Sequence, residues 1–91
     1  MTRAILTVVG HDKTGVIAKF SATLSANNAN ILDVNQNIMN GDIFAMMMLI
    51  DVSGLSCSFK ELSAALTEDG NALEMSVHVM HEDVFNAMHH V

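Results

Sequence analysis

Apolar and polar positions alternate along the chain with two different periods, and the period changes several times. Residues 3–9 (RAILTVV) alternate as an extended strand does, and both of their faces are largely apolar. A strand that is apolar on both faces is typical of the middle of a sheet. Residues 14–27 then take a helical spacing, and Asp12 or Thr14 is expected to cap the first turn. The apolar stripe of this helix is Val16, Ile17, Phe20 and Leu24.

The next two strand-like segments are joined by a strong hairpin signal. Residues 27–30 (NNAN) are expected to stop the helix, because asparagine tolerates the left-handed conformation of a helix end. Residues 31–39 predict an edge strand with one polar face. Asn40 and Gly41 predict a tight turn into residues 42–52, which are apolar on both faces and predict a second central strand. In the edge strand, Leu32, Val34 and Ile38 share a face with Gln36, and Asp33, Asn35 and Asn37 lie opposite.

A second helix, a fourth strand and a short tail complete the pattern. Ser58 and Glu61 form a Ser-x-x-Glu capping box that opens a helix, and Gly70 is a suitable stop for it. Residues 71–80 alternate as a second edge strand. In the tail, Asp83 can cap one to three helical turns. The expected buried positions are Phe59, Leu62, Ala65 and Leu66 in the helix and Leu73, Met75, Val77 and Val79 in the strand. In the tail, Val84, Phe85 and Met88 would share one side of a helix that packs on the body or on a partner.

The order βαββαβ predicts an α+β, ferredoxin-like sandwich, because each βαβ half needs a right-handed crossover. We expect a four-stranded antiparallel sheet with two helices on one face, within a domain of residues 1–80, and a tail of residues 81–91 with a short helix. The other face of the sheet would be a contiguous apolar patch, which monomers usually avoid. We predict that another chain, or the tail, covers it. Its apolar positions are Ile5, Val9, Ile43, Ala45, Met47 and Leu49.

Charge narrows the classes of partner. The 91 residues carry a net charge of −6, and the only basic side chains are Arg3, Lys13, Lys19 and Lys60. Nucleic-acid binding draws on clustered positive charge, so nucleic acids and anionic membranes are not expected partners. No apolar run reaches the ~18 residues of a membrane span. The single cysteine, Cys57, cannot form an internal disulfide, which fits a reducing, cytoplasmic environment.

The histidines do not form a convincing metal site. His78 and His81 are separated by an odd number of positions, so they would face opposite sides of one strand. His89 and His90 are adjacent and also diverge on a helix. We therefore expect no metal and no cofactor, and we interpret Cys57 as an inert residue.

Residues 10–16 (GHDKTGV) connect the first strand to the first helix, and they are the main candidate for chemistry. A loop of this composition can cradle an anion, hold a metal or simply turn the chain. The segment resembles the opening of the ACT domain, in which Asp/Asn-Arg-Pro-Gly precedes the helix and Asn-Ile begins the second strand. Here Asp12, Lys13, Thr14 and Gly15 occupy the first motif, and Asn30 and Ile31 the second. Thr14 stands where the family usually has proline, and Lys13 where it often has arginine.

The length, the element order and the tail resemble the small free-standing ACT proteins of bacteria and archaea, a glycine-cleavage-repressor-like group. The resemblance implies a non-enzymatic regulatory module that acts as a homodimer and binds an amino acid at the junction between units. Helix amides would donate hydrogen bonds to the carboxylate, and Gly15 would let the backbone approach the ligand closely. Asp12 suits the ammonium group, and Asn30 suits a contact that both donates and accepts. The implied site residues are His11, Asp12, Lys13, Thr14, Gly15, Val16, Asn30 and Ile31.

Two alternatives stay open. Asp12, Gly15 and Asn30 can have purely structural roles as cap, turn and helix stop, and His11 can be an exposed turn residue. The chain would then be an oligomerisation module without a ligand. Enzymes are a third class, since acylphosphatases share the element order. They need an arginine near the first helix and heavy-metal-transfer domains need Cys-x-x-Cys there, and the loop has neither. RNA-recognition domains need stacking aromatic residues and clustered positive charge, and this chain has no Trp, no Tyr and no basic cluster.

Overall fold

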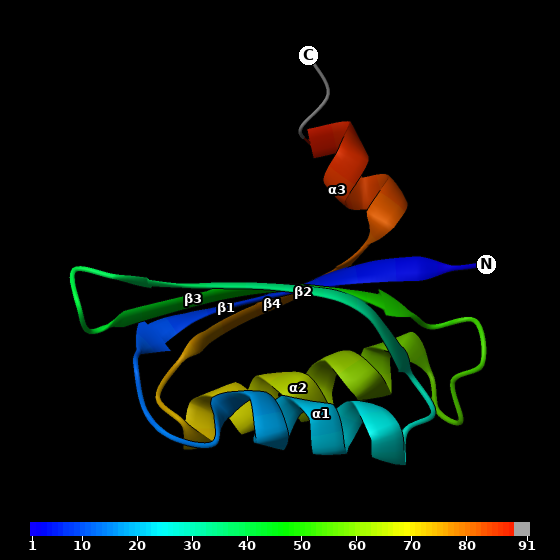
Figure 1. Cartoon of the computed structure of the whole chain (residues 1–91). Coiled ribbons are helices and arrows are strands. Elements are labelled where there is room, and N and C mark those ends of the chain that lie inside the picture. Colours follow the sequence, from blue (N-terminus) through cyan, green and yellow to red (C-terminus); the bar gives the residue numbers. More distant parts are fainter. Residues whose placement is uncertain (89–91) are drawn as a thin grey trace.

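The computed structural model describes residues 1–88, and Figure 1 shows a sheet with two helices below it and a third helix above it. This is the ferredoxin-like α+β sandwich that the sequence predicts. The elements are β1 (Arg3–His11), α1 (Val16–Ala26), β2 (Asn30–Met39), β3 (Ile43–Asp51), α2 (Phe59–Ala72), β4 (Ser76–His81) and α3 (Glu82–Met88).

The sheet is antiparallel in the order β2-β3-β1-β4, so the prediction of two central and two edge strands is confirmed. Alternate residues of the central strands point toward α1 and α2 and form the core. Leu6, Val8 and Met48 are fully buried there, and they meet Phe20 of α1 and Leu66 of α2. A hydrogen bond from the Thr23 hydroxyl to the Asp69 carboxylate also links the two helices.

The boundary between α2 and β4 differs from the prediction. Gly70 does not end α2; the helix continues to Ala72, and Glu74 takes the left-handed conformation that turns the chain. Residues 71–75 are therefore not strand. Gly70 is buried because the returning chain crosses it closely: a Cβ atom on Gly70 would lie 2.2 Å from Cγ2 of Val77. The glycine permits contact between helix and strand and is not a stop signal.

The edge strand β2 contains a β-bulge that changes its predicted faces. Ile31 pairs with Ile50 and Asp33 with Leu49, so Leu32 is an extra residue without a cross-strand partner. Ile31 packs against the core in the position that the alternation assigns to Leu32, which is 40% exposed. No β2 residue is fully buried.

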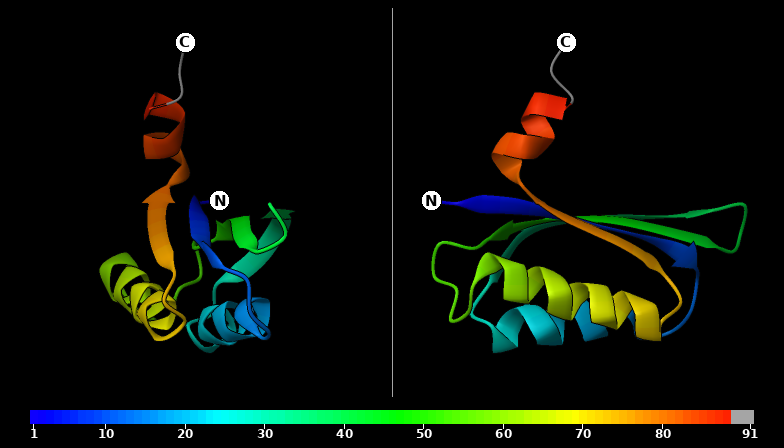
Figure 2. Two further views of the ribbon diagram at one scale, coloured as in Figure 1. Left: turned by 90° about the vertical axis from the view of Figure 1, so that its left-hand side faces the viewer. Right: turned by 180° about the vertical axis from the view of Figure 1, so that it is seen from behind.

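The sheet face opposite α1 and α2 is named here the open face. Register places on it Ile5, Thr7 and Val9 of β1, Ala45, Met47 and Leu49 of β3, and positions of β2 and β4 beside them. The tail does not cover it, because α3 stands away from the sheet (Figure 2). Ile5 is only 7% exposed, but Val9 and Met47 remain 46% and 40% exposed.

The tail helix also starts differently from its prediction. It begins at Glu82, so Asp83 lies within the first turn instead of capping it. Within residues 1–88, no helix is long and apolar enough to cross a membrane.

Candidate functional site

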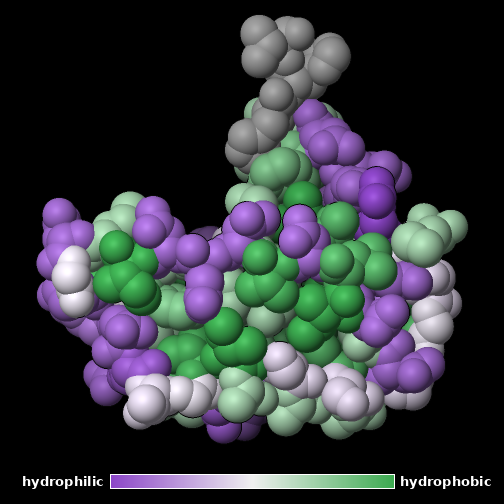
Figure 3. All heavy atoms as spheres, viewed as in Figure 1, coloured by the Kyte–Doolittle hydropathy of each residue, from purple (hydrophilic) through white to green (hydrophobic). Residues whose placement is uncertain are grey.

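A groove follows the edge of the molecule between α1 and β2. Figure 3 shows apolar side chains gathered in the band between these two elements, below a row of polar side chains. Two hollows lie in the groove. The first hollow, of about 500 Å³, is at the start of α1 and the end of β2. It is lined by Asp12, Lys13, Gly15, Val16, Ile17, Ala18, Gln36, Asn37, Ile38 and Phe44.

The wall of the first hollow includes a helix start whose amides have no side-chain partner. Gly15 is the N-cap of α1, in the left-handed conformation with φ 83°, and no side chain caps the first turn. The prediction that Asp12 or Thr14 caps α1 is therefore wrong. The first intrahelical bond runs from the Lys19 amide to the Gly15 carbonyl, so the preceding N–H groups of the turn are available to an acceptor.

Four of the predicted site residues, Asp12, Lys13, Gly15 and Val16, come together in the first hollow. His11 and Thr14 line neither hollow. The His11 ring lies at the hairpin, where its Nδ1 is 3.7 Å from Oδ2 of Asp42, and its side chain is 84% exposed.

Asn30 and Ile31 line the second hollow, which has about 430 Å³ and lies at the other end of α1. Within one chain they do not meet the loop. The helix stop next to them is confirmed: Asn28 adopts φ 59°, and its side-chain amide donates a 2.6 Å hydrogen bond to the Gly54 carbonyl.

Sequence reasoning missed the β2 contribution to the first hollow, namely Gln36, Asn37 and Ile38. The signal was present in the topology. In a strand–helix–strand crossover the second strand runs antiparallel to the helix, so the end of β2 must lie beside the start of α1. Gln36 and Asn37 add amide donors and acceptors, and Ile38 and Phe44 add an apolar wall.

The carboxyl groups whose pKa is lowered in the structure take part in local hydrogen bonds of a turn and a helix cap. Hydrogen bonds from the Ser53 hydroxyl and amide lower the pKa of Asp51, and the Ser58 amide and hydroxyl lower the pKa of Glu61. The second pair is the predicted capping box of α2, which is confirmed. Neither carboxyl lies in the groove.

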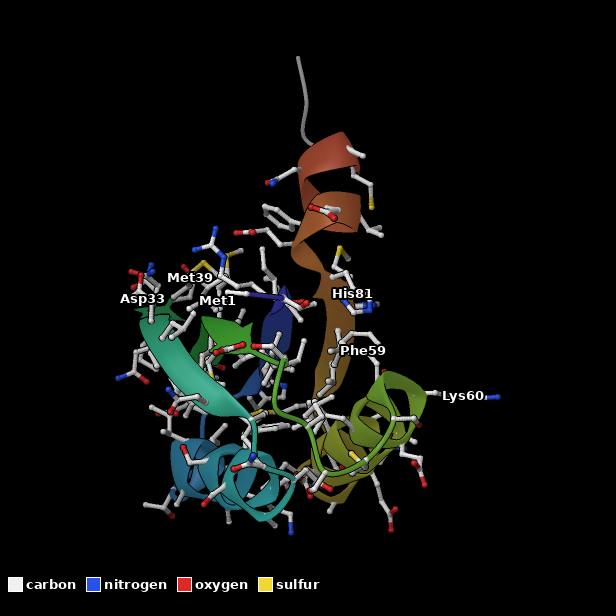
Figure 4. All side chains as sticks on the ribbon, turned by 90° about the vertical axis from the view of Figure 1, so that its right-hand side faces the viewer. Met1, Asp33, Met39, Phe59, Lys60 and His81 are labelled. Carbon is white, nitrogen blue, oxygen red and sulfur yellow. The ribbon has the colours of Figure 1, made fainter. Side chains whose placement is uncertain are left out.

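His81 is part of a packed contact instead of a ligand set. Its ring stacks on Phe59 with centroids 3.9 Å apart, as Figure 4 shows. Within residues 1–88, no three histidine, cysteine or acidic side chains come together as metal ligands. His89 and His90 lie outside the described residues.

The βαββαβ sandwich, with two hollows along its β2 edge, is the architecture of a small ferredoxin-like α+β domain. The family model for the ACT domain matches residues 2–80. The chain belongs to the ACT domain family.

Related proteins agree with this assignment. A UPF0237 protein of Methanocaldococcus jannaschii is 44% identical over 91 residues, which is all of both chains. An ACT domain protein from Streptococcus pneumoniae has a solved structure with a TM-score of 0.78 and 28% identity, covering 92% of this chain and 93% of that one. A structure assigned as a glycine cleavage system transcriptional repressor has a TM-score of 0.72 at 20% identity, covering 88% of this chain and 45% of that one; this likeness concerns the fold.

Proposed function

We propose that this chain is a non-enzymatic regulatory module that binds an amino acid in the first hollow and works as a homodimer. One observation carries the proposal: the first turn of α1 has no side-chain cap and lines a hollow that Asp12 also lines. Amino acids carry a carboxylate and an ammonium group. A site that offers free amides and a carboxylate complements both.

Each part of the ligand has a matching part of the hollow. The α-carboxylate would accept hydrogen bonds from the amides at the start of α1, with Lys13 nearby as a positive charge. The ammonium group would donate to Asp12. The amides of Gln36 and Asn37 can satisfy the remaining donors and acceptors, and a ligand side chain would lie against Ile38 and Phe44.

The first hollow is open, and the β2 edge beside it suits a second copy. Val34 and Ile38 of this edge are 38% and 45% exposed. If two β2 strands pair antiparallel about a two-fold axis, the start of one strand lies beside the end of the other. Asn30 and Ile31 of one copy would then approach the first hollow of the other. This arrangement accounts for predicted site residues that lie apart within one chain.

Regulation follows if the ligand binds one state of the dimer more tightly than another. A ligand held between two copies contacts both, so its binding free energy differs between the paired and unpaired states. The paired state would be the signal read by a partner protein.

The direct test is thermal unfolding in the presence of each common amino acid. A ligand at a hundred times its Kd adds about 2.7 kcal/mol to the free energy of unfolding. For a domain of this size each kcal/mol corresponds to roughly 4–8 °C in Tm, so the rise should exceed 10 °C. If no amino acid raises Tm at millimolar concentration, the proposal is rejected.

A matched pair of variants locates the site. Asp12→Asn removes the carboxylate in the first hollow, and binding should weaken about tenfold or more, because hydrogen bonds to charged groups contribute about 1.5–3 kcal/mol. Asp42→Asn removes a neighbouring, exposed carboxylate that does not line the hollow, and binding should be unchanged. Equal effects of the two substitutions would contradict the site.

The open face favours a second candidate function, an assembly module without a ligand. Exposed Val9 and Met47 need a cover whether or not a ligand binds. Unchanged assembly in Asp12→Asn, together with no thermal response to any amino acid, would support this candidate over the first.

A further inference from the structure

The open face and α3 together form a surface that the chain leaves uncovered. Three cross-strand rows of the sheet part span all four strands, and Asp33 on the edge strand β2 is the only carboxylate in them. The rows that pair Arg3 with Asp51 and His11 with Ile43 flank them. The centre is apolar, with Val9 and Met47 exposed, and Thr7 and the β2 amides border a hollow of about 460 Å³ beside them. An apolar centre with a polar rim is the usual anatomy of a protein interface.

The helix α3 is held upright beside this face and presents an apolar stripe. Arg3 and Glu82 hold its base through two contacts, Nε to Oε1 at 3.0 Å and Nη2 to Oε2 at 2.8 Å. Val84 and Met88 lie one turn apart on the helix and are 49% and 66% exposed. No α3 residue is fully buried among those described. The chain therefore fixes this helix in position without covering its apolar side.

We propose that a second copy of this chain covers the surface, with α3 of each copy lying against the open face of the other. A flat face with a helix standing at its border has the profile of a step (Figures 1 and 2). Two such steps fit together about a two-fold axis, because each helix occupies the space above the partner's sheet. Self-complementarity of this kind is the requirement for an isologous dimer.

The area of the surface is large enough for a specific interface. Four strands about 4.8 Å apart and three rows about 6.8 Å apart give roughly 400 Å² of sheet per copy. One side of a two-turn helix adds about 100 Å². From these rows alone, two sheets and two helix sides together bury roughly 1,000 Å², which is the lower limit for a specific interface.

The open face offers a basic partner little to bind, because the three rows that span all four strands carry one carboxylate, Asp33. The chain has a net charge of −6, so two copies repel each other, and the open face is where this repulsion is small because its centre is uncharged. Added salt screens repulsion between copies and should strengthen self-association. A basic partner would instead bind more weakly as salt rises. The direction of the salt effect distinguishes the two occupants.

Sedimentation of matched variants tests this interface separately from the β2 edge pairing proposed above. Met47 and Val34 are 40% and 38% exposed, so Met47→Glu and Val34→Glu disturb folding similarly but charge different surfaces. We expect Met47→Glu, and a chain ending at His81, to lose one step of assembly at 10–100 µM (roughly tenfold weaker or more), while Val34→Glu retains it. Salt should strengthen this step in the unsubstituted chain. Assembly of Met47→Glu that equals the unsubstituted chain would overturn the proposal and leave the ligand site untouched.

Cross-linking tests the exchange of α3 directly. In a Cys57→Ser background, chains with Val84→Cys are mixed with chains carrying Val9→Cys and treated with a short bis-maleimide. We expect mixed dimers in this mixture and few in a control with Lys60→Cys, since Lys60 points outward from α2 (Figure 4). Equal yields in both mixtures would contradict the exchange. Unsubstituted chain that sediments only as a monomer at 100 µM would contradict the interface altogether.

Discussion

The close contact between α2 and β4 gives a quantitative prediction about Gly70. A Cβ atom at this position would lie 2.2 Å from Cγ2 of Val77 and 3.1 Å from the Met75 carbonyl oxygen. Carbon atoms normally stay about 3.5 Å apart, so Gly70→Ala brings two methyl groups about 1.3 Å too close. Overpacking of this kind costs about 1–3 kcal/mol. The gain in helix propensity from Gly to Ala is only about 0.5–1 kcal/mol, so the net result should be a loss centred on about 1 kcal/mol, within a range of about 0 to 2.5 kcal/mol.

A double-mutant cycle isolates that overlap. In a Val77→Ala background the obstructing Cγ2 is absent, so Gly70→Ala should cost little or even stabilise the helix. The coupling between the two substitutions should be about 1–3 kcal/mol. Because the chain has no tryptophan or tyrosine, urea unfolding is best followed by far-ultraviolet circular dichroism. If Gly70→Ala destabilises equally in both backgrounds, the overlap with Val77 is not the cause and the reasoning fails.

Substitutions at three further positions test the helix starts. Gly15→Ala should lower the free energy of unfolding by about 1–2 kcal/mol through backbone strain alone, because φ is 83° and a Cβ there meets nothing within 4 Å. Gly15→Asn should cost less, because asparagine tolerates the left-handed conformation, and a thermal melt of both variants checks this. Ser58→Ala should cost about 1 kcal/mol in urea unfolding, because the α2 capping box is lost. Folding lowers the pKa of Glu61, so its contribution to the free energy of unfolding is present above the ordinary glutamate range and is lost as the pH falls through the lowered value. Glu61→Gln should therefore flatten the dependence of Tm on pH between about pH 6 and pH 3. An unchanged acid slope would contradict this.

The order of elements and the central position of β1 and β3 could be predicted, because the spacing of apolar residues along the chain reflects which faces are buried. The start of β4 could not. Leu73 and Met75 alternate as strand residues do, but Met75 is buried by the turn, where its amide bonds to the Gly70 carbonyl at 2.8 Å. The local pattern is the same for a strand and for a turn whose alternate residues are buried. Only the packing of α2 on β4 distinguishes the two.

Part of the candidate site could likewise be predicted from sequence and part could not. Asp12, Lys13 and Gly15 could be proposed from sequence, because a loop before a helix start has defined chemistry. Gln36 and Asn37 line the first hollow because the fold brings the end of β2 beside the start of α1. The alternation of that strand predicts only that one of its faces is polar. The prediction that Asn30 belongs to the same site depends on a second copy, which no pattern within one chain can specify.

The bulge at Leu32 limits what can be added to the outer edge of the sheet. An uninterrupted edge strand is a template on which further chains can stack without end, and this is how fibrils grow. One extra residue near the start of β2 kinks that template, so backbone pairing stays regular only from Asp33 onward. A short match of this kind can hold one neighbour but is a poor seed for fibril growth from this exposed edge.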